Sequence, residues 1–327
     1  MQIGAKIAFD EAYALTTDNP MRIQGNTRHD GKSGFERSHT GGFPNIGVRP
    51  KFKLSRDSKF FTIGSCFARN IEFQLEKMQV DVITTKYTIP GDLYELTGLG
   101  ARNGALNAYT PSSMLELINI NARPDRADCG VIQTGPDEWC DMLVTGIRPV
   151  NVEELGLVRN RVLSAYEEMT TADVVVVTLG FTESWFDNQD GMFVNRSPAG
   201  SRKTMRAKSR FDFFNAGPAE ALETLNQIVL DIRRLTDNRA KVVISVSPVP
   251  LHGTFTDRDV ISANLYSKCT LLSSAVTIAS RYEFVDYYPS YEMVTMTKSE
   301  DAWEDDGIHV QSSCVEKAIQ TFADAYF

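Results

Sequence analysis

Short apolar runs alternate with helix-period segments along most of the chain. The run KFFTIG at 59–64 has a strand pattern, and in the following segment, 66–78, apolar residues return every three or four positions. The run ADVVVVTLG at 172–180 is almost entirely apolar and rich in β-branched residues, which is typical of a central strand buried on both faces. Strands joined by helices in this way predict a parallel α/β sheet.

The same alternation continues to the end of the chain. The remaining predicted elements are helices over 111–120, 218–236, 259–281 and 312–327, and strands over 80–85, 241–250 and 282–289. Longer excursions interrupt the alternation at about 86–110, 121–165 and 186–217. The sequence therefore predicts a three-layer α/β/α sandwich with a mainly parallel five-stranded sheet and inserted loops.

The N-terminal part of the chain differs from the rest. Residues 1–57 are rich in Gly, Asn, Arg and Pro and show weak periodicity, which predicts an irregular arm that packs on a later core. The remainder, 58–327, is expected to form a single domain. With 327 residues and 42% hydrophobic composition, the chain can bury a substantial core.

Charge and cysteine content exclude several classes of function. The formal net charge of −8 argues against a nucleic-acid partner, which usually binds a basic face. The five cysteines have no C-x-x-C spacing, so neither a disulfide framework nor a clustered zinc site is indicated. The first twenty residues include acidic side chains and no long apolar run, so we expect no secretory signal and no membrane anchor. A cytoplasmic protein with reduced thiols is the simplest interpretation.

Polar residues follow the predicted strands where each of them ends. The four segments are Gly64-Ser65-Cys66 and the ranges 178–185, 247–250 and 303–310. In doubly wound sheets, ligands bind outside the carboxyl ends of the strands, so we expect these segments to converge on one site.

Ser65 and Cys66 are both candidate nucleophiles. A serine needs a base, usually a histidine whose tautomer is fixed by a carboxylate, and Asp306 and His309 form a D-x-x-H arrangement suited to that task. Ser65 could instead be a helix N-cap, and Cys66 a small buried residue under the first helix. A thiolate at Cys66 is the third alternative, because a helix N-terminus lowers a thiol pKa.

The pentapeptide Gly64-Ser65-Cys66-Phe67-Ala68 resembles the motif for which the GSCFA family is named. The resemblance extends from about residue 50 to about residue 310 and includes TLGFTESW, SVSPVPL, YYPSYEMV and the pair Asp306 and His309. GSCFA proteins look like a branch of the SGNH (GDSL-like) hydrolases, which implies a flavodoxin-like sandwich. It also implies Ser65 as nucleophile, His309 as base and Asp306 as the orienting carboxylate.

The resemblance implies an oxyanion hole as well, formed by the Ser65 N–H, a glycine and an asparagine. The sequence departs from the SGNH pattern at the last position, where Thr182 stands in place of the asparagine. We expect Gly104 to supply the glycine and Asn107 to be a further side-chain donor. Losing one such donor costs about 100-fold to 1,000-fold in rate.

Several residues near the strand ends are candidate substrate contacts. Glu183 could bind substrate hydroxyls, fix the loops of the site, or simply begin a helix. Trp185 and Trp303 could pack on sugar rings or on the protein itself, and His252 could contact substrate or be an ordinary loop residue. The segment 196–210 contains six basic residues and no acidic one, so with Arg202 and Arg206 it could attract an anionic substrate or be a solvated loop.

These observations predict a serine-dependent ester hydrolase or O-acyltransferase with the triad Ser65, His309 and Asp306. The resemblance implies a small acyl group such as acetyl, carried by a carbohydrate hydroxyl. The expected partner is thus a small-molecule or glycan ester that could be anionic, with no nucleic acid, no membrane, no metal and no cofactor. The alternative is a non-catalytic protein of the same fold that binds a glycan or a nucleotide sugar.

Overall fold

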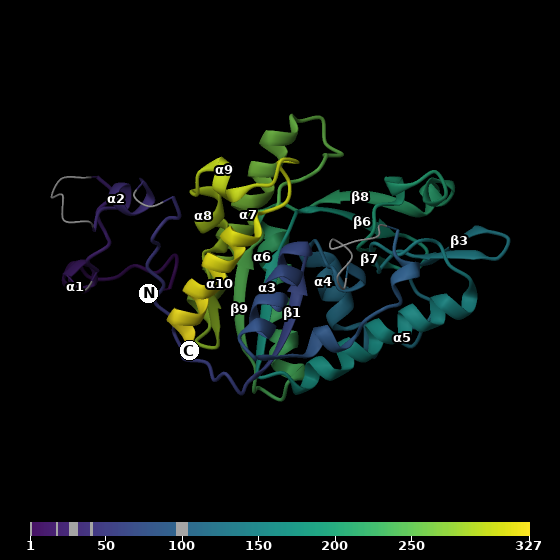
Figure 1. The fold of residues 1–327 in the computed structure, drawn as a ribbon, viewed down its shortest axis with the longest axis horizontal. Helices are drawn as coiled ribbons and strands as arrows, with labels where there is room; N and C mark the ends of the chain where they lie inside the picture. The colour runs from purple at the N-terminus through teal and green to yellow at the C-terminus, as the bar shows by residue number, and fades with distance from the viewer. Residues whose placement is uncertain (1, 18, 26–31, 40–41, 96–103) are drawn as a thin grey trace.

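The computed structural model describes residues 2–17, 19–25, 32–39, 42–95 and 104–327. Its main sheet contains five parallel strands in the order β10-β9-β5-β1-β2 (Figure 1). These strands are β1 (Lys59–Gly64), β2 (Asp81–Val82), β5 (Val174–Leu179), β9 (Lys241–Val246) and β10 (Val285–Tyr287). Numbered along the chain, the order is that of flavodoxin, 2-1-3-4-5, so the predicted fold class is confirmed.

Helices cover both faces of this sheet. One face packs on α3 (Cys66–Lys77), α8 (Ser290–Thr295), α9 (Ser299–Ala302) and α10 (Ser312–Tyr326), and the other on α4 (Pro111–Ile118), α5 (Val152–Glu168), α6 (Pro218–Leu235) and α7 (Val260–Arg281). Successive residues of β1 pack on opposite faces of the sheet. Phe60 packs with α3 and α10, whereas Phe61 and Ile63 pack with α5 to α7. The alternation follows from the period of two residues in a strand.

Predicted and observed elements agree in position, with shorter strands at the sheet edges. The run predicted as a strand at 80–85 gives only the two residues of β2, after which the chain turns into the 3₁₀ helix η1 (Ile83–Lys86). The helix predicted at 111–120 is α4, and Thr110 and Ser113 form a reciprocal capping box at its start. A second short turn, η5 (Ile120–Ala122), follows it.

The excursions contain regular elements that we did not predict. A hairpin of β3 (Val131–Gly135) and β4 (Glu138–Asp141) precedes helix α5, and η6 (Met169–Thr171) follows that helix. A separate antiparallel sheet consists of β6 (Glu183–Asp187), β7 (Met192–Val194) and β8 (Phe211–Asn215). The remaining 3₁₀ turns described are η2 (Gly91–Leu93), η4 (Gly104–Leu106), η7 (Pro198–Gly200) and η8 (Thr204–Arg210). Glu183 begins a strand, so the alternative that it begins a helix is wrong.

The N-terminal arm contains two short helices, α1 (Phe9–Thr17) and α2 (Gly34–His39), and lies to one side of the sheet (Figure 1). Its last part joins the core. The backbone N–H of Lys51 donates to Asp286 at 3.0 Å, and that of Leu54 donates to the carbonyl oxygen of Tyr326 at 2.8 Å. Within the described residues, no helix combines the length and apolarity needed to span a bilayer.

Candidate active site

Ser65 follows the last residue of β1 and precedes the first residue of α3. Gly64 makes this connection possible, because a Cβ there would lie 2.8 Å from the Cβ and carbonyl oxygen of Thr178 and 2.9 Å from the Cβ of Ala68. Ser65 occupies the N-cap position of α3, but its side chain accepts no capping hydrogen bond. The hydroxyl is therefore not used to cap the helix.

The Ser65 hydroxyl lies 3.3 Å from the hydroxyl of Ser247, which follows the end of β9. Either oxygen can be the donor. Ser65 is 1% exposed, so its hydroxyl is enclosed at the carboxyl edge of the sheet. The segment after β1 and the segment after β9 were both expected at this site, and the contact between Ser65 and Ser247 shows that they meet.

Cys66 is the first residue of α3 and is only partly buried. Burial raises the pKa of its thiol, and this effect outweighs the hydrogen bonds and the charge of Lys268, which act in the opposite direction. A thiol with a raised pKa is mostly protonated near neutral pH, so this environment does not activate Cys66 as a nucleophile.

Asp306 and His309 form a closed turn after α9. One carboxylate oxygen of Asp306 accepts the backbone N–H groups of Ile308 and His309 at 2.8 and 2.9 Å, and the other lies 2.5 Å from Nδ1 of His309. The hydrogen bond to the His309 ring, followed by the two backbone N–H groups, lowers the pKa of Asp306 to about 2. Asp306 is therefore ionised at neutral pH and fixes the orientation of the imidazole.

Ser65 and His309 have different hydrogen-bond partners. In the described part of the chain, no hydrogen bond joins the two side chains, and none involves Nε2 of His309. The side chain of His309 is 54% exposed, whereas Ser65 is enclosed. The structure thus contains an Asp306–His309 pair and a separate Ser65–Ser247 pair, and the triad remains a prediction.

Asn107 lies directly beside Gly64. The two residues form a parallel β-bridge, and the backbone N–H of Ala108 donates to the carbonyl oxygen of Gly64 at 2.8 Å. The amide nitrogen of Asn107 makes only a long contact, 3.4 Å, to the hydroxyl of Tyr109, and its amide oxygen is buried without a partner among the described residues. This amide, beside Gly64, therefore leaves much of its hydrogen-bonding capacity unused within the described residues.

Gly104 lies in η4, in the same segment as Asn107, and its carbonyl oxygen accepts from the backbone N–H of Asn107 and from the hydroxyl of Thr145, both at 3.0 Å. Thr182 is more firmly engaged. Its hydroxyl lies 2.7 Å from both Asn215 Oδ1 and Ser267 Oγ, and its only hydroxyl proton is donated to one of them. In this arrangement Thr182 ties β6 to α7 and has no proton left for an oxyanion.

Lys268 of α7 is buried beneath the strand ends, with 0% exposure. Its Nζ donates to the carbonyl oxygens of Gly180 at 2.9 Å and Val249 at 2.7 Å, and lies 4.8 Å from the ring centroid of Phe181. Burial lowers the pKa of Lys268 to about 7. The ammonium group links the segment after β5 to the segment after β9.

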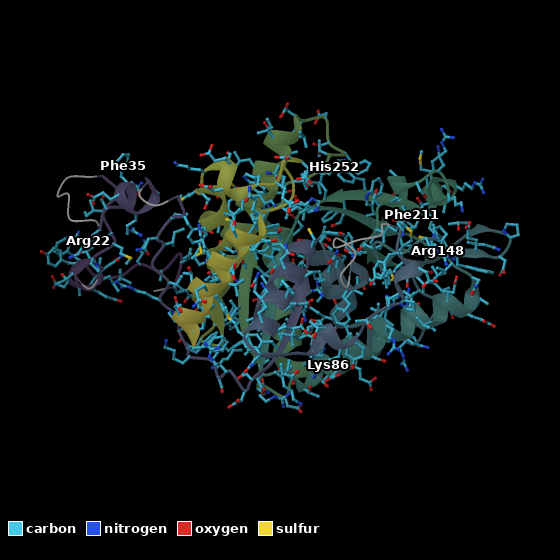
Figure 2. All side chains as sticks on the ribbon, viewed as in Figure 1. Arg22, Phe35, Lys86, Arg148, Phe211 and His252 are labelled. Carbon is cyan, nitrogen blue, oxygen red and sulfur yellow. The ribbon has the colours of Figure 1, made fainter. Side chains whose placement is uncertain are left out.

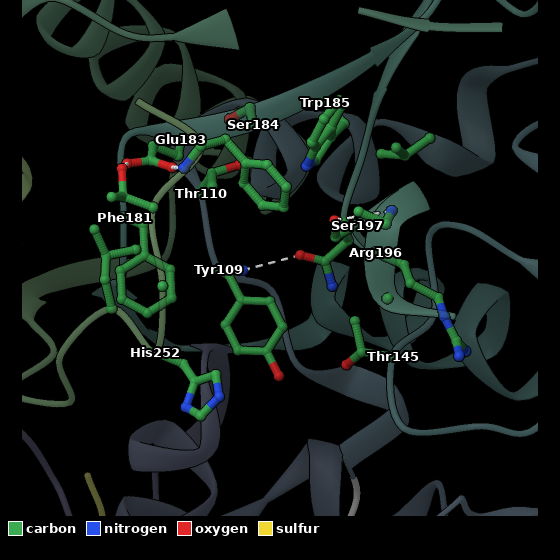
Figure 3. Close-up of a pocket in the computed structure, with 18 of the residues that line it drawn as sticks. Tyr109, Thr110, Thr145, Phe181, Glu183, Ser184, Trp185, Arg196, Ser197 and His252 are labelled. Carbon is green, nitrogen blue, oxygen red and sulfur yellow. Dashed lines mark hydrogen bonds between the residues drawn. The ribbon is translucent and has the colours of Figure 1, made fainter. Parts of the chain in front are cut away.

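A pocket of about 530 Å³ opens beside these segments, in the size range of small-molecule sites (Figure 3). Its aromatic residues come from three parts of the chain: Tyr109, Phe181, Trp185 and Phe255. The phenol of Tyr109 reaches between His252 and Thr145 (Figure 3). Figure 2 labels His252 in the upper middle of the view, away from the arm that carries Arg22 and Phe35.

Glu183 fixes one side of this pocket. Its carboxylate accepts from the hydroxyl of Thr254 at 2.6 Å and from the backbone N–H of Phe255 at 2.9 Å. Trp185 packs on Phe255 with ring centroids 4.9 Å apart. Of the three roles considered for Glu183, holding the loop at 251–255 is the one that these contacts describe.

The segment 107–109 connects the pocket with the turn at Gly64 and Ser65. Asn107 adjoins Gly64, and Tyr109, two residues later, lines the pocket. Asn195 fixes this segment, because its side chain accepts from the backbone N–H of Tyr109 at 3.0 Å and donates to the carbonyl oxygen of Asn107. Ser65 and His309 are not among the residues that line the pocket.

The other predicted contacts lie elsewhere. Trp303 forms an antiparallel bridge with Val310 and packs on the α3 and α10 core. Arg206 donates to the carbonyl oxygen of Thr134 at 3.3 Å, and neither Arg202 nor Arg206 lines the pocket. Arg196, at the start of the basic segment, does line it.

Three exposed side chains have the geometry to share a metal ion. Ligand atoms of Glu304, Asp306 and His309 lie within 4.8 Å of one another. Asp306 already uses both of its oxygens in the turn, and exposed acidic groups often cluster without an ion. The arrangement is explained by hydrogen bonding alone.

A family model described as the GSCFA family matches residues 59–322, from β1 to α10. The chain belongs to the GSCFA family. A search of curated proteins finds no match. The GSCFA match begins at β1, so it includes Ser65, the pocket and the Asp306–His309 pair but not the N-terminal arm.

Sequence reasoning missed Lys268 in this GSCFA protein and gave Ser247 no role of its own. Ser247 was named only as part of the segment 247–250, which was expected to converge on the site. Lys268 gave no signal, since a lysine on an amphipathic helix is normally placed on the solvated face. Only the packing of α7 against the strand ends shows that this lysine points inward.

Proposed function

We propose that this GSCFA protein is a serine-dependent ester hydrolase or O-acyltransferase in which Ser65 is the nucleophile, His309 the base and Asp306 the orienting carboxylate. The observation that carries the proposal is the 2.5 Å contact between Asp306 and Nδ1 of His309, which leaves Nε2 open to accept a proton. The Ser65 hydroxyl, uncommitted to helix capping, is the natural partner.

The reaction follows from these roles. The Ser65 oxygen attacks the ester carbonyl carbon while its proton passes to Nε2 of His309, and the tetrahedral adduct then expels the alkoxide, which takes that proton. An acyl-Ser65 ester remains. Water or an acceptor hydroxyl attacks it, His309 accepts the proton of the incoming group, and the acyl–oxygen bond to Ser65 breaks as the proton returns. Water gives hydrolysis, and a sugar hydroxyl gives transfer.

The negative charge on the adduct needs donors beside Ser65. We assign this role to the Ser65 N–H and the side-chain amide of Asn107, with Gly104 as a third candidate. Asn107 replaces Thr182 in this proposal, because the Thr182 hydroxyl would first have to leave Asn215 and Ser267. The bridge between Asn107 and Gly64 supports the assignment.

The proposal requires His309 to approach Ser65. A working base lies about 2.6 to 3.2 Å from the hydroxyl it deprotonates, and such contacts are often longer before substrate binds. The exposed position of His309 on a short turn after α9 leaves room for this movement. The pocket would hold the alcohol part of the ester, which we take to be a carbohydrate bearing a small acyl group.

A fluorophosphonate probe, read by intact mass, tests the proposal. We expect one adduct on the wild type, located at Ser65 by peptide mapping, and no adduct on Ser65→Ala or His309→Ala. Cys66→Ala should label normally, and Ser273→Ala, which removes an exposed hydroxyl from α7, is the matched control. A folded wild type that is not labelled would contradict the proposal, and labelling lost only in Cys66→Ala would favour a thiol enzyme.

A second function is favoured by the separation of the pocket from Ser65 and His309. A protein that only binds a glycan or nucleotide sugar would need the pocket but not the triad. Ligand binding that persists in Ser65→Ala, together with an unlabelled wild type, would support this alternative.

A further inference from the structure

Three of the six basic residues of the segment 196–210 pair with carboxylates of the protein, and Arg196 is the one of the six that lines the pocket. Lys203 lies 2.6 Å from Glu138, Arg210 pairs with Asp187 at 2.6 Å, and Arg196 pairs with Glu95. Ion pairs of this kind use the same N–H donors that an anionic ligand would need. The segment therefore does not present the pocket with a set of unused cations.

The charged groups that line the pocket do not favour an anion either. They are the carboxylates of Glu95 and Glu183 and the guanidinium of Arg196, so acidic groups outnumber basic ones. Arg196 also donates to the carbonyl oxygen of Ile147 at 2.6 Å, so fewer of its N–H groups remain to bind an anionic ligand. Lys268 lies behind the Phe181 ring and donates to two carbonyl oxygens, so it cannot bind a ligand in the pocket.

The uncharged part of the lining combines aromatic walls with hydroxyl groups. The rings of Tyr109 and Phe181 are stacked, with centroids 6.1 Å apart. Ser184 is 2% exposed, and its hydroxyl has no partner among the described residues. A buried hydroxyl without a partner is costly, so a ligand hydroxyl that pairs with it gains affinity. A purely aromatic ligand would leave that hydroxyl unpaired.

We propose that the pocket takes an uncharged pyranose ring, with its C–H face on the aromatic walls and a hydroxyl on Ser184, and that it rejects anionic sugars. This inference rests on the proposed function for its link to an ester, but the ring can bind without any reaction at Ser65. Nucleotide sugars, uronates and sugar phosphates are then excluded as ligands of this pocket.

The first test compares ligands that differ only in charge. Methyl glucoside, galactoside and mannoside are titrated against Ser65→Ala and followed by saturation-transfer NMR, each beside its uronate. We expect at least one neutral glycoside to bind, with its uronate about tenfold or more weaker, which corresponds to 1.4 kcal/mol. Equal or tighter binding of the uronate overturns the proposal, as does the absence of binding by all three neutral glycosides at their solubility limits.

The second test removes the unpaired hydroxyl. Ser184→Ala should weaken the neutral glycoside several-fold without lowering the midpoint of thermal unfolding, because no protein partner is lost. Thr178→Val is the matched control: its hydroxyl is also buried without a partner among the described residues, but Thr178 does not line the pocket. Equal weakening in the two variants, or tighter binding of methyl benzoate than of any glycoside, overturns the proposal.

The two proposals can fail independently. If the fluorophosphonate does not label Ser65 but the neutral glycoside binds and Ser184→Ala weakens it, the proposed reaction is wrong and the pocket assignment stands. If Ser65 is labelled but no neutral glycoside binds, the pocket assignment is wrong and the reaction stands.

Discussion

The hydroxyls of Ser65 and Ser247 meet at 3.3 Å although their strands, β1 and β9, are not neighbours in the sheet. Strand β5 lies between them, so the contact passes over its carboxyl end. The switch point of a 2-1-3-4-5 sheet lies between its first and third strands, here β1 and β5, which is where such folds bind ligands. The pair therefore lies at the end of the sheet where folds of this type bind ligands.

Replacing Ser247 tests which of the two hydroxyls donates. In the proposed reaction the Ser65 proton goes to His309, so Ser247 would be the donor, and its hydrogen bond would stabilise the attacking oxygen. We expect Ser247→Ala to slow fluorophosphonate labelling of Ser65 about fivefold, which corresponds to about 1 kcal/mol for a neutral hydrogen bond. Faster labelling would contradict this and identify Ser247 as an acceptor that restrains Ser65.

Replacing Asp306 by asparagine tests the tautomer argument. The amide of Asp306→Asn would donate to Nδ1 of His309, so the ring proton would move to Nε2, which could no longer accept from Ser65. Labelling of Ser65 should fall by about 1,000-fold or more, as in other serine triads with this change. Asp305→Asn is the matched control, because the 2.5 Å contact to His309 belongs to Asp306. Comparable labelling rates in the two variants would exclude Asp306 as the orienting group.

Lys268 predicts a specific dependence of stability on pH. Burial lowers its pKa from 10.5 to about 7, so between these pH values the unfolded chain binds a proton that the folded chain lacks. Stability then rises with pH, by an amount on the order of a few kcal/mol when the whole interval is crossed. It is fully present above the unfolded pKa and is lost as the pH falls through about 7.

Urea unfolding at pH 7 and pH 9 measures this effect. The gain in unfolding free energy between the two pH values should be larger for the wild type than for Lys268→Met, since other titrating groups contribute to both proteins. Measurements above pH 9 are avoided, because the raised pKa of Cys66 makes stability fall there. An equal gain in both proteins would show that the two carbonyl acceptors and the Phe181 ring keep Lys268 charged.

Sequence reasoning located the main sheet because its strands and helices differ in hydrophobic period. It missed helix α5, although Asn151 and Glu154 form a capping box at its start that the sequence displays. It also missed the sheet of β6, β7 and β8, whose strands alternate less clearly and pair only with one another. Residues of β6 and β7 line one side of the pocket, so the pocket could not be predicted.

Prediction was also uneven within the site. The turn of Asp306 and His309 is local, so a three-residue spacing was enough to pair them. Asn107 and Gly64 are joined by an isolated β-bridge between segments far apart in sequence. Lys268 reaches Gly180 and Val249 through the packing of α7, and no local pattern indicates either contact. The role expected of Thr182 depended on its neighbours Asn215 and Ser267, which lie far away in sequence.

Gly180 offers a final test of how the pocket is joined to the strand ends. A Cβ there would lie 2.5 Å from the carbonyl oxygen of Tyr109, which accepts the backbone N–H groups of Gly180 and Phe181, both at 3.0 Å. Gly180→Ala should therefore separate these segments and lower the unfolding free energy by about 1 to 3 kcal/mol. Because Tyr109 and Phe181 both line the pocket, binding of the neutral glycoside should weaken as well.

Gly253→Ala is the matched control on the same pocket, since a Cβ at Gly253 meets no atom within 4 Å. If Gly180→Ala were as stable as Gly253→Ala in thermal unfolding, the close contact with Tyr109 would not be what holds the pocket to β5.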